Sequence, residues 1–115
     1  MTVPDFQSIM LPLLRFAADG NEHSIAEARG QLASDFNLTE EEQAELLPTG
    51  RTSRYANRVS WARTYLSQAG LLRVPRRGRF QITDAGRELL KSPPHRISIG
   101  FLEKYPDFVT FRSKR

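Results

Sequence analysis

One helical segment and the residues directly after it most constrain what this chain can fold into. Projected at 100° per residue, residues 53–69 separate into two faces. The apolar face holds Tyr55, Val59, Ala62, Leu66 and Ala69, with Tyr65 at its margin. Gly70 then suits a left-handed helix C-cap, and "LLRVP" and "RFQIT" are short β-like runs separated by "RRG". The sequence therefore predicts a long helix followed at once by a hairpin with an arginine-rich tip.

Further helices are predicted before this segment. Residues 4–19 carry apolar side chains at helical spacing, and Pro12 either kinks this helix or marks its real start. Two capping boxes follow, in which a serine or threonine and a glutamate three residues later satisfy the first amides of a helix. Ser24 with Glu27 opens a helix over residues 24–36, and Thr39 with Glu42 opens a short acidic helix over residues 39–47.

The part of the chain after the hairpin is also predicted to be helical in places. Thr83 or Asp84 caps a helix that "SPP" ends at residues 92–94. The segment "HRISIGFLEKYPDFVTF" is too apolar for a free tail, so we expect part of it to pack on the core, with a short helix before Pro106. The final "RSKR" reads as a basic, frayed terminus.

Helix, helix, helix, hairpin, helix is the element order of a winged helix-turn-helix. The expected fold class is therefore mainly α (α+β), a winged helix-turn-helix with a two-stranded wing and an extra C-terminal helical segment. Because 115 residues are the length of one small domain, we expect residues 1–115 to form a single domain, with residues 92–115 as a C-terminal extension or linker.

The net charge of +4 conceals a strong segregation along the chain. Two arginines and nine acidic residues give residues 1–50 a charge of −7, whereas residues 51–91 carry +8 and residues 92–115 carry +3. Such segregation favours one face for a polyanion and another turned away from it. The alternative is an ordinary solvated surface whose charge varies locally.

Several classes of site and protein are not expected. Without cysteine there is no disulfide and no thiolate metal site, and His23 and His95 are isolated, so we expect no metal and no cofactor. No glycine-rich phosphate loop or nucleophile elbow is found, so this chain alone is not expected to be an enzyme. Neither a signal peptide nor a membrane-spanning apolar run is present, which predicts a cytoplasmic protein.

In a winged helix the helix before the hairpin enters the major groove of duplex DNA, with the hairpin beside it. The residues predicted to bind DNA are Arg51, Thr52, Ser53, Arg54, Asn57, Arg58, Ser60, Trp61, Arg63, Thr64, Arg76, Arg77 and Arg79. Small side chains such as Ser60 allow a close approach. Asn57 suits a bidentate contact to adenine, and Arg63 suits guanine or phosphate.

The remaining predicted contacts are to the DNA backbone. Arg51, Thr52 and Arg54 lie near the helix N-terminus, where amides and arginines hold phosphate. The arginines of the hairpin would straddle the backbone or reach into a minor groove, since three arginines at one turn repel each other without a polyanion.

Other residues have competing structural explanations. Trp61 and Tyr65 could pack in the core, as aromatic side chains mostly do. Arg58 lies close to the apolar face, so a buried ion pair with the acidic half is as well supported as a DNA contact. Asn57 could instead orient the loop before the helix.

The sequence "NRVSWARTYLSQAGLLRVPRRGRFQITDAGRELL", residues 57–90, resembles the N-terminal winged-helix domain of Mrr-type restriction system proteins. The resemblance extends to "PDFQSIMLPLLRFAADGNEHSIAEA" near the N-terminus and to "ISIGFLEKYPDFVTF", with its Tyr-Pro-acid-Phe run. It implies a domain that recognises double-stranded DNA in a system that restricts methylated DNA. It also implies cleavage by a separate C-terminal nuclease domain, so we expect this chain to be the N-terminal part of a longer restriction protein.

If a modified base is read, the aromatic side chains nearest the predicted reading face are Trp61 and Tyr55. One methyl group offers only about 1 kcal/mol of apolar burial, so an aromatic wall or a flipped, stacked base would increase discrimination. Two rival functions stay open. A transcriptional regulator would bind a palindromic operator as a homodimer. A protein-interaction winged helix would use the acidic half as its surface and bind DNA weakly.

Overall fold

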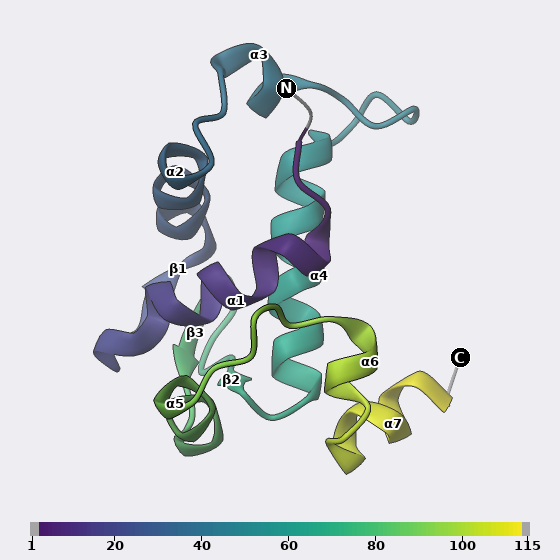
Figure 1. Cartoon of the computed structure of the whole chain (residues 1–115). Helices are drawn as coiled ribbons and strands as arrows, with labels where there is room; N and C mark the ends of the chain where they lie inside the picture. Colours follow the sequence, from purple (N-terminus) through teal and green to yellow (C-terminus); the bar gives the residue numbers. More distant parts are fainter. Residues whose placement is uncertain (1–2, 114–115) are drawn as a thin grey trace.

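The helix α4, Arg54–Gln68, runs through the middle of the molecule and contacts α1, α2, α3, β2 and α7 (Figure 1). The computed structural model describes residues 3–113. The other helical elements are α1 Phe6–Phe16, the 3-10 turn η1 Ala17–Asp19, α2 Ile25–Asp35, α3 Glu40–Ala44, α5 Asp84–Lys91, α6 Ile99–Leu102 and α7 Pro106–Ser113. The strands are β1 His23–Ser24, β2 Leu72–Arg73 and β3 Arg79–Ile82. The α+β, winged-helix-like class predicted from the sequence is confirmed.

The sheet is antiparallel with the order β1-β3-β2, and its hairpin is the predicted one. In the hairpin Leu72 pairs with Ile82. The third strand, β1, was not predicted: His23 lies opposite Phe80, and the strand has only two residues. Since two residues carry no alternating pattern, only pairing with a distant strand reveals β1.

The predicted helix boundaries are mostly confirmed. Both capping boxes form, with Ser24 and Thr39 as N-caps, and Thr83 rather than Asp84 caps α5. Pro12 lies inside α1, which begins at Phe6. Gly70 has the expected left-handed backbone, with φ 84°.

The acidic helix is shorter than predicted. Instead of continuing through Leu47, α3 ends at Ala44, because Glu45 turns to φ −56°, ψ 124° and Leu46 forms a bridge with Ser53. The backbone after α3 therefore folds into a hairpin-like loop instead of another helical turn.

The C-terminal segment contains the expected short helix, α6, and a second helix, α7, that was not predicted. Phe108 of α7 is fully buried. Pro106 begins α7, a position where its missing N–H leaves no bond unmade. Arg112 and Ser113, expected to be frayed, belong to α7, while Lys114 and Arg115 lie outside the described residues.

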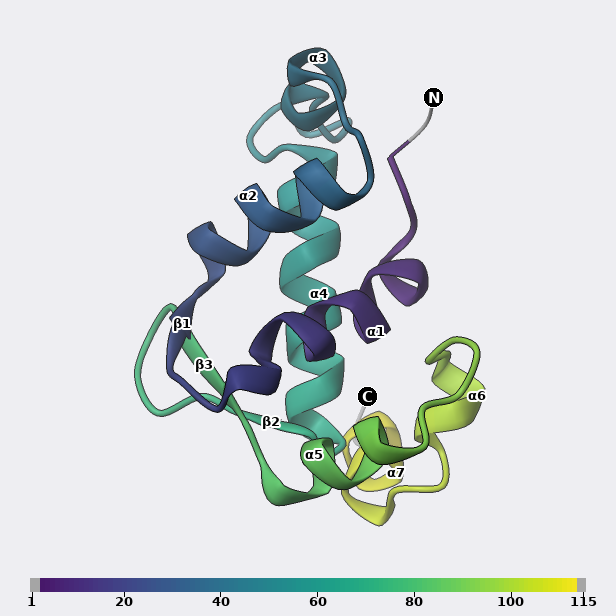
Figure 2. The ribbon, with the colours of Figure 1, turned by 60° about the vertical axis from the view of Figure 1, so that its left-hand side comes forward.

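The core forms mainly where α1 crosses α4, as both views show (Figure 2). The apolar face of α4 predicted from periodicity is buried as expected. The fully buried large side chains that share this core are Ile9, Met10, Leu13 and Leu14 from α1, Leu32 from α2, Phe80 from β3, and Leu102 and Phe108 from the C-terminal helices. Burial of one face of α4 leaves its other face for function.

Candidate nucleic-acid interface

The face of α4 opposite the core carries short polar side chains with no partner inside the protein. Asn57, Ser60 and Thr64 are each partly exposed. Within residues 3–113 none of their side-chain polar groups forms a hydrogen bond. Asn57 in particular does not bond the preceding loop, so the alternative in which it orients that loop is wrong. These groups are free to bond an external ligand.

A short loop stands at the N-terminal end of α4. Leu47 N–H donates to Thr52 O (3.0 Å), and Gly50, with φ 73°, donates to Leu47 O (2.8 Å). The predicted contacts Arg51 and Thr52 are exposed on this loop. Ser53 accepts a hydrogen bond from Ala56 N–H (2.9 Å), so its hydroxyl caps the helix.

Arg54 begins α4 and is already paired. Its Nε lies 2.7 Å from Glu45 Oε1, and its backbone N–H donates to Glu45 O, also at 2.7 Å. The arginine side chain is one-third exposed. The pair ties the base of the loop together, and a phosphate would have to share Arg54 with Glu45.

The second basic loop is the wing between β2 and β3, which we define as residues 74–79. Arg76 and Arg79 both meet Glu22, at 3.0 and 3.2 Å from its Oε1. The expectation that three arginines at this turn repel each other without a polyanion is therefore wrong, because Glu22 lies between two of them. Arg77 is exposed and has no ion pair with any residue that the structure describes.

The acidic N-terminal half is not turned away from the basic residues, as the charge segregation suggested. Glu22 and Glu45 both belong to that half and both contact predicted DNA-binding arginines. Sequence analysis missed these glutamates because Glu22 and Arg79 are 57 positions apart. Only tertiary structure brings them together.

Tyr55 and Trp61, the two aromatic side chains proposed for a modified base, differ in exposure. Tyr55, proposed beside the reading face, is 2% exposed, and its hydroxyl donates to Arg29 O at 2.7 Å. Burial raises the pKa of Tyr55 to about 12. Placing Tyr55 near a modified base was therefore wrong. Trp61 is 42% exposed and stands edge-on to the buried Tyr65, with ring centroids 5.8 Å apart.

Arg58 forms no ion pair with the acidic half among the residues described, and its DNA contact stays a prediction. Its Nη1 donates to the carbonyls of Val3 (2.8 Å) and Pro4 (3.3 Å), so it bonds to backbone instead of a carboxylate. The guanidinium therefore holds the chain before α1 against α4.

Arg63 and Ser67 lie one turn apart on α4 and contain buried polar atoms. Arg63 Nε and Ser67 Oγ have almost no solvent contact and no hydrogen-bond partner among the residues described. Ser67 is not among the residues predicted to bind DNA, but it lies four residues after Arg63, a spacing that puts both on one side of α4.

His23 lies behind the wing, on β1. Its Nε2 is 2.9 Å from the Asp19 carboxylate, its Nδ1 is 3.4 Å from Glu27, and its ring packs on Phe16. Partial burial lowers the pKa of His23, but its hydrogen bonds to the carboxylates of Asp19 and Glu27 outweigh this effect and raise the pKa above its usual value. The His23 imidazole therefore lies against two more acids of the N-terminal half, Asp19 and Glu27.

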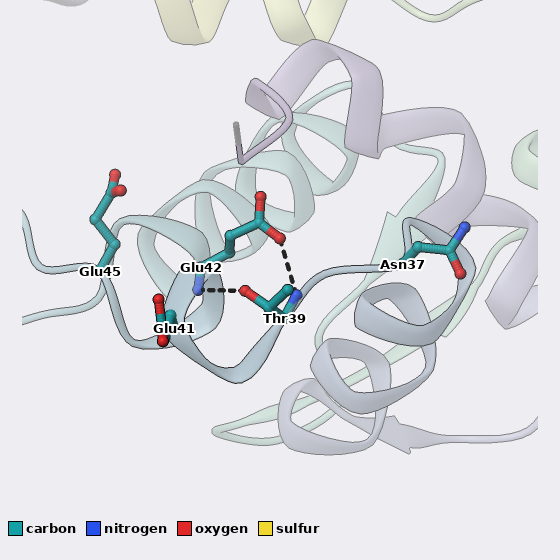
Figure 3. A pocket seen from close by; sticks show the side chains of 5 residues that line it. All are labelled: Asn37, Thr39, Glu41, Glu42 and Glu45. Carbon is teal, nitrogen blue, oxygen red and sulfur yellow. Dashed lines mark hydrogen bonds between the residues drawn. The ribbon is translucent and has the colours of Figure 1, made fainter. Parts of the chain in front are cut away.

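An acidic pocket lies beside α3 and is lined by Asn37, Thr39, Glu41, Glu42 and Glu45 (Figure 3). Thr39 N–H donates to the Glu42 carboxylate (2.9 Å), and this bond holds the pKa of Glu42 below its usual value. The dashed bonds in Figure 3 are those of the capping box, so the pocket's main polar contacts serve the helix end. Its negative lining does not suit a nucleic acid.

Within residues 3–113, no group of three or more potential ligands could hold a metal ion. None of the described helices is long and apolar enough to cross a membrane. The basic and polar surface of α4 and its flanking loops is thus the candidate site.

Comparison with known proteins gives two matches. The Mrr N-terminal domain family matches residues 6–92. The type IV methyl-directed restriction enzyme EcoKMrr of Escherichia coli (strain K12) is 33% identical over 95 residues, which cover 82% of this chain but 31% of that enzyme. The chain thus spans less than a third of this relative's length. No solved structure matches the chain.

Proposed function

This chain belongs to the Mrr N-terminal domain family, and on that premise we propose that it is the target-recognition domain of an Mrr-like restriction protein and binds duplex DNA. Cleavage would then belong to a nuclease domain outside this chain. The whole relative is a methyl-directed restriction enzyme. We therefore extend the proposal to recognition of modified DNA by a protein of the cytoplasm.

The observation that carries the proposal is the unpartnered polar face of α4 between two loops that bear arginine. Asn57, Ser60 and Thr64 would meet base edges in the major groove, with Asn57 donating to and accepting from an adenine. Arg51 and Arg77, which have no ion pair among the described residues, would hold phosphates at the two ends. Unmet hydrogen-bonding groups on a rigid helix favour a ligand that satisfies them.

Arg58 and Ser53 are left out of the proposed contacts. The Arg58 guanidinium is occupied by two backbone carbonyls, and the Ser53 hydroxyl caps α4. Their effects on DNA binding would act through the position of α4. Arg63 stays in the proposal, because the residue is partly exposed on α4 and a guanidinium suits a phosphate or a guanine.

Recognition of a modified base is assigned to Trp61. Its ring is the exposed aromatic surface on the flank of α4, and Tyr65 holds it edge-on. A methyl group alone contributes about 1 kcal/mol by burial, whereas stacking on an aromatic ring contributes about 1–3 kcal/mol per base. Trp61 would therefore contribute most if the base is unstacked against it.

The test is duplex binding at two salt concentrations with matched unmodified, N6-methyladenine and 5-methylcytosine DNA. We expect binding that weakens with salt, because phosphate contacts release counterions, and tighter binding to one methylated duplex. Trp61→Ala should abolish that preference, and Trp61→Phe should retain part of it. Equal binding to all three duplexes would refute modification reading and favour an operator-binding regulator, with a homodimer in light scattering. No binding at low salt would refute the DNA proposal and favour a protein partner.

A further inference from the structure

The three arginines of the wing differ in their partners. Arg76 and Arg79 share one oxygen of Glu22, whose side chain is 26% exposed. Arg79 is also 3.9 Å from Glu27 and is 38% exposed, whereas Arg76 is 72% exposed. Arg77 lies between them in sequence without a carboxylate partner within residues 3–113.

The turn at the tip of the wing explains why Arg76 and Arg79, but not Arg77, reach Glu22. Arg79 N–H donates to Arg76 O at 3.1 Å, which closes a tight turn with Gly78 at φ 76°. Because the first and last residues of such a turn come close together, Arg76 and Arg79 can reach the same carboxylate. Arg77 occupies a central position of the turn. Ile25 N–H donates to Gly78 O (3.1 Å), which fixes the tip beside the start of α2.

From this geometry, and resting on the proposed DNA binding, we infer that Glu22 is an internal counter-ion that occupies two of the wing arginines in place of a DNA phosphate. Arg77 then carries the wing's phosphate contact, and Arg79 holds the wing to the N-terminal half of the domain. The acidic half thereby limits the affinity of the basic half for a polyanion.

The physical reason is charge compensation. Arg76 and Arg79 together with Glu22 carry a net charge of +1 instead of +2, and Glu27, 3.9 Å from Arg79, compensates part of the rest. The two arginines therefore bring less positive charge to a phosphate, and a phosphate that displaces Glu22 leaves its carboxylate uncompensated near the DNA. Counterion release counts the net phosphates neutralised, with a slope of about −0.9 per contact in log affinity against log salt. Between 50 and 200 mM salt, each contact therefore multiplies the loss of affinity by about 3.5-fold.

The experiment measures duplex affinity at about 50 and 200 mM salt, the range in which phosphate contacts are readily counted. The unaltered protein is compared with Glu22→Gln, Arg77→Ala, Arg79→Ala and the control Glu103→Gln. The control removes the same charge from the end of α6, on the side of the molecule away from the wing (Figure 2). Circular dichroism checks that each variant is folded at the temperature of the assay.

Glu22→Gln should bind more tightly at the lower salt, and its loss of affinity at the higher salt should be about 3.5-fold larger for each arginine that it frees. Arg77→Ala should bind more weakly, and the ratio of its affinity at the lower salt to its affinity at the higher salt should be about 3.5-fold smaller than that of the unaltered protein. Arg79→Ala and Glu103→Gln should keep the unaltered ratio.

The inference is overturned if the unaltered protein binds and Glu22→Gln has the same salt dependence as Glu103→Gln. It is also overturned if Arg79→Ala reduces the salt dependence as much as Arg77→Ala, a comparison that does not require the Glu22 variant to fold. Failure of the unaltered protein to bind DNA at the lower salt overturns the proposed function itself, which separates the two failures.

Discussion

Replacing Gly86 by alanine should destabilise this domain, because the helix α5 approaches the hairpin too closely there for a side chain. A Cβ at Gly86 would lie 2.3 Å from Leu71 O and 2.7 Å from Ile82 Cγ1. The carbonyl of Leu71 has little freedom to move, since it accepts a hydrogen bond from Thr83 N–H at 3.1 Å. Either α5 or the backbone at Leu71, directly before β2, would have to shift.

The magnitude follows from two opposing effects. Overpacking of a dense interior costs about 1–3 kcal/mol, and a backbone contact as short as this one favours the upper part of that range. Alanine in place of glycine within a helix returns about 0.5–1 kcal/mol. We therefore expect Gly86→Ala to lower the free energy of unfolding by about 1–2 kcal/mol.

Gly30→Ala is the matched control. Gly30 lies within α2, and a Cβ there would have no neighbour within 4 Å. Only the helix preference applies, so stability should rise by about 0.5–1 kcal/mol. Urea unfolding followed by circular dichroism measures both changes, and thermal unfolding should move in opposite directions. A Gly86→Ala protein as stable as the unaltered one would refute the reasoning from close packing.

Three further predictions concern side chains on α4 and β1. Arg58→Met should lower the free energy of unfolding by about 1.5 kcal/mol, as expected for charged hydrogen bonds to backbone. The salt dependence of DNA binding should stay unchanged. A weaker salt dependence would make Arg58 a DNA contact. Tyr55→Phe should lower the free energy of unfolding by about 1 kcal/mol, measured in urea, and leave the preference among methylated duplexes intact. The pKa of His23 is raised in the folded protein, so its stabilising effect is complete below its unfolded pKa of about 6.5 and is lost as pH rises through the folded pKa. His23→Gln should therefore lose more stability at mildly acidic pH than at alkaline pH; an equal loss at every pH would contradict this assignment.

The elements that were predictable from the sequence depend on neighbouring residues. The period of apolar side chains identified α4, and the reciprocal serine or threonine and glutamate pairs identified the starts of α2 and α3. Gly70 marked the end of α4. Each of these features is local, since the interacting groups are within four residues of one another.

The features that were missed depend on residues far apart in sequence. β1 exists because His23 pairs with Phe80, and α7 is held by burial of Phe108 rather than by a regular apolar period. In the candidate site the types of residue were predictable, but their partners were not. The Glu22 contacts are the main example, because a carboxylate 57 positions from Arg79 gives no local pattern.

The position of α4 between the two basic loops also fixes a length. Its 15 residues make a rod of about 22 Å, with the loop of residues 46–53 at its start and the wing's first strand, β2, close after its end (Figure 1). Since α4 is packed by α1 along its buried face, this separation is already set before any ligand arrives. The two loops are thus held at a fixed separation. A partner that touches both would bind without the entropic cost of ordering one loop relative to the other. Inserting one turn into α4 should therefore move the two loops apart and change which partners fit.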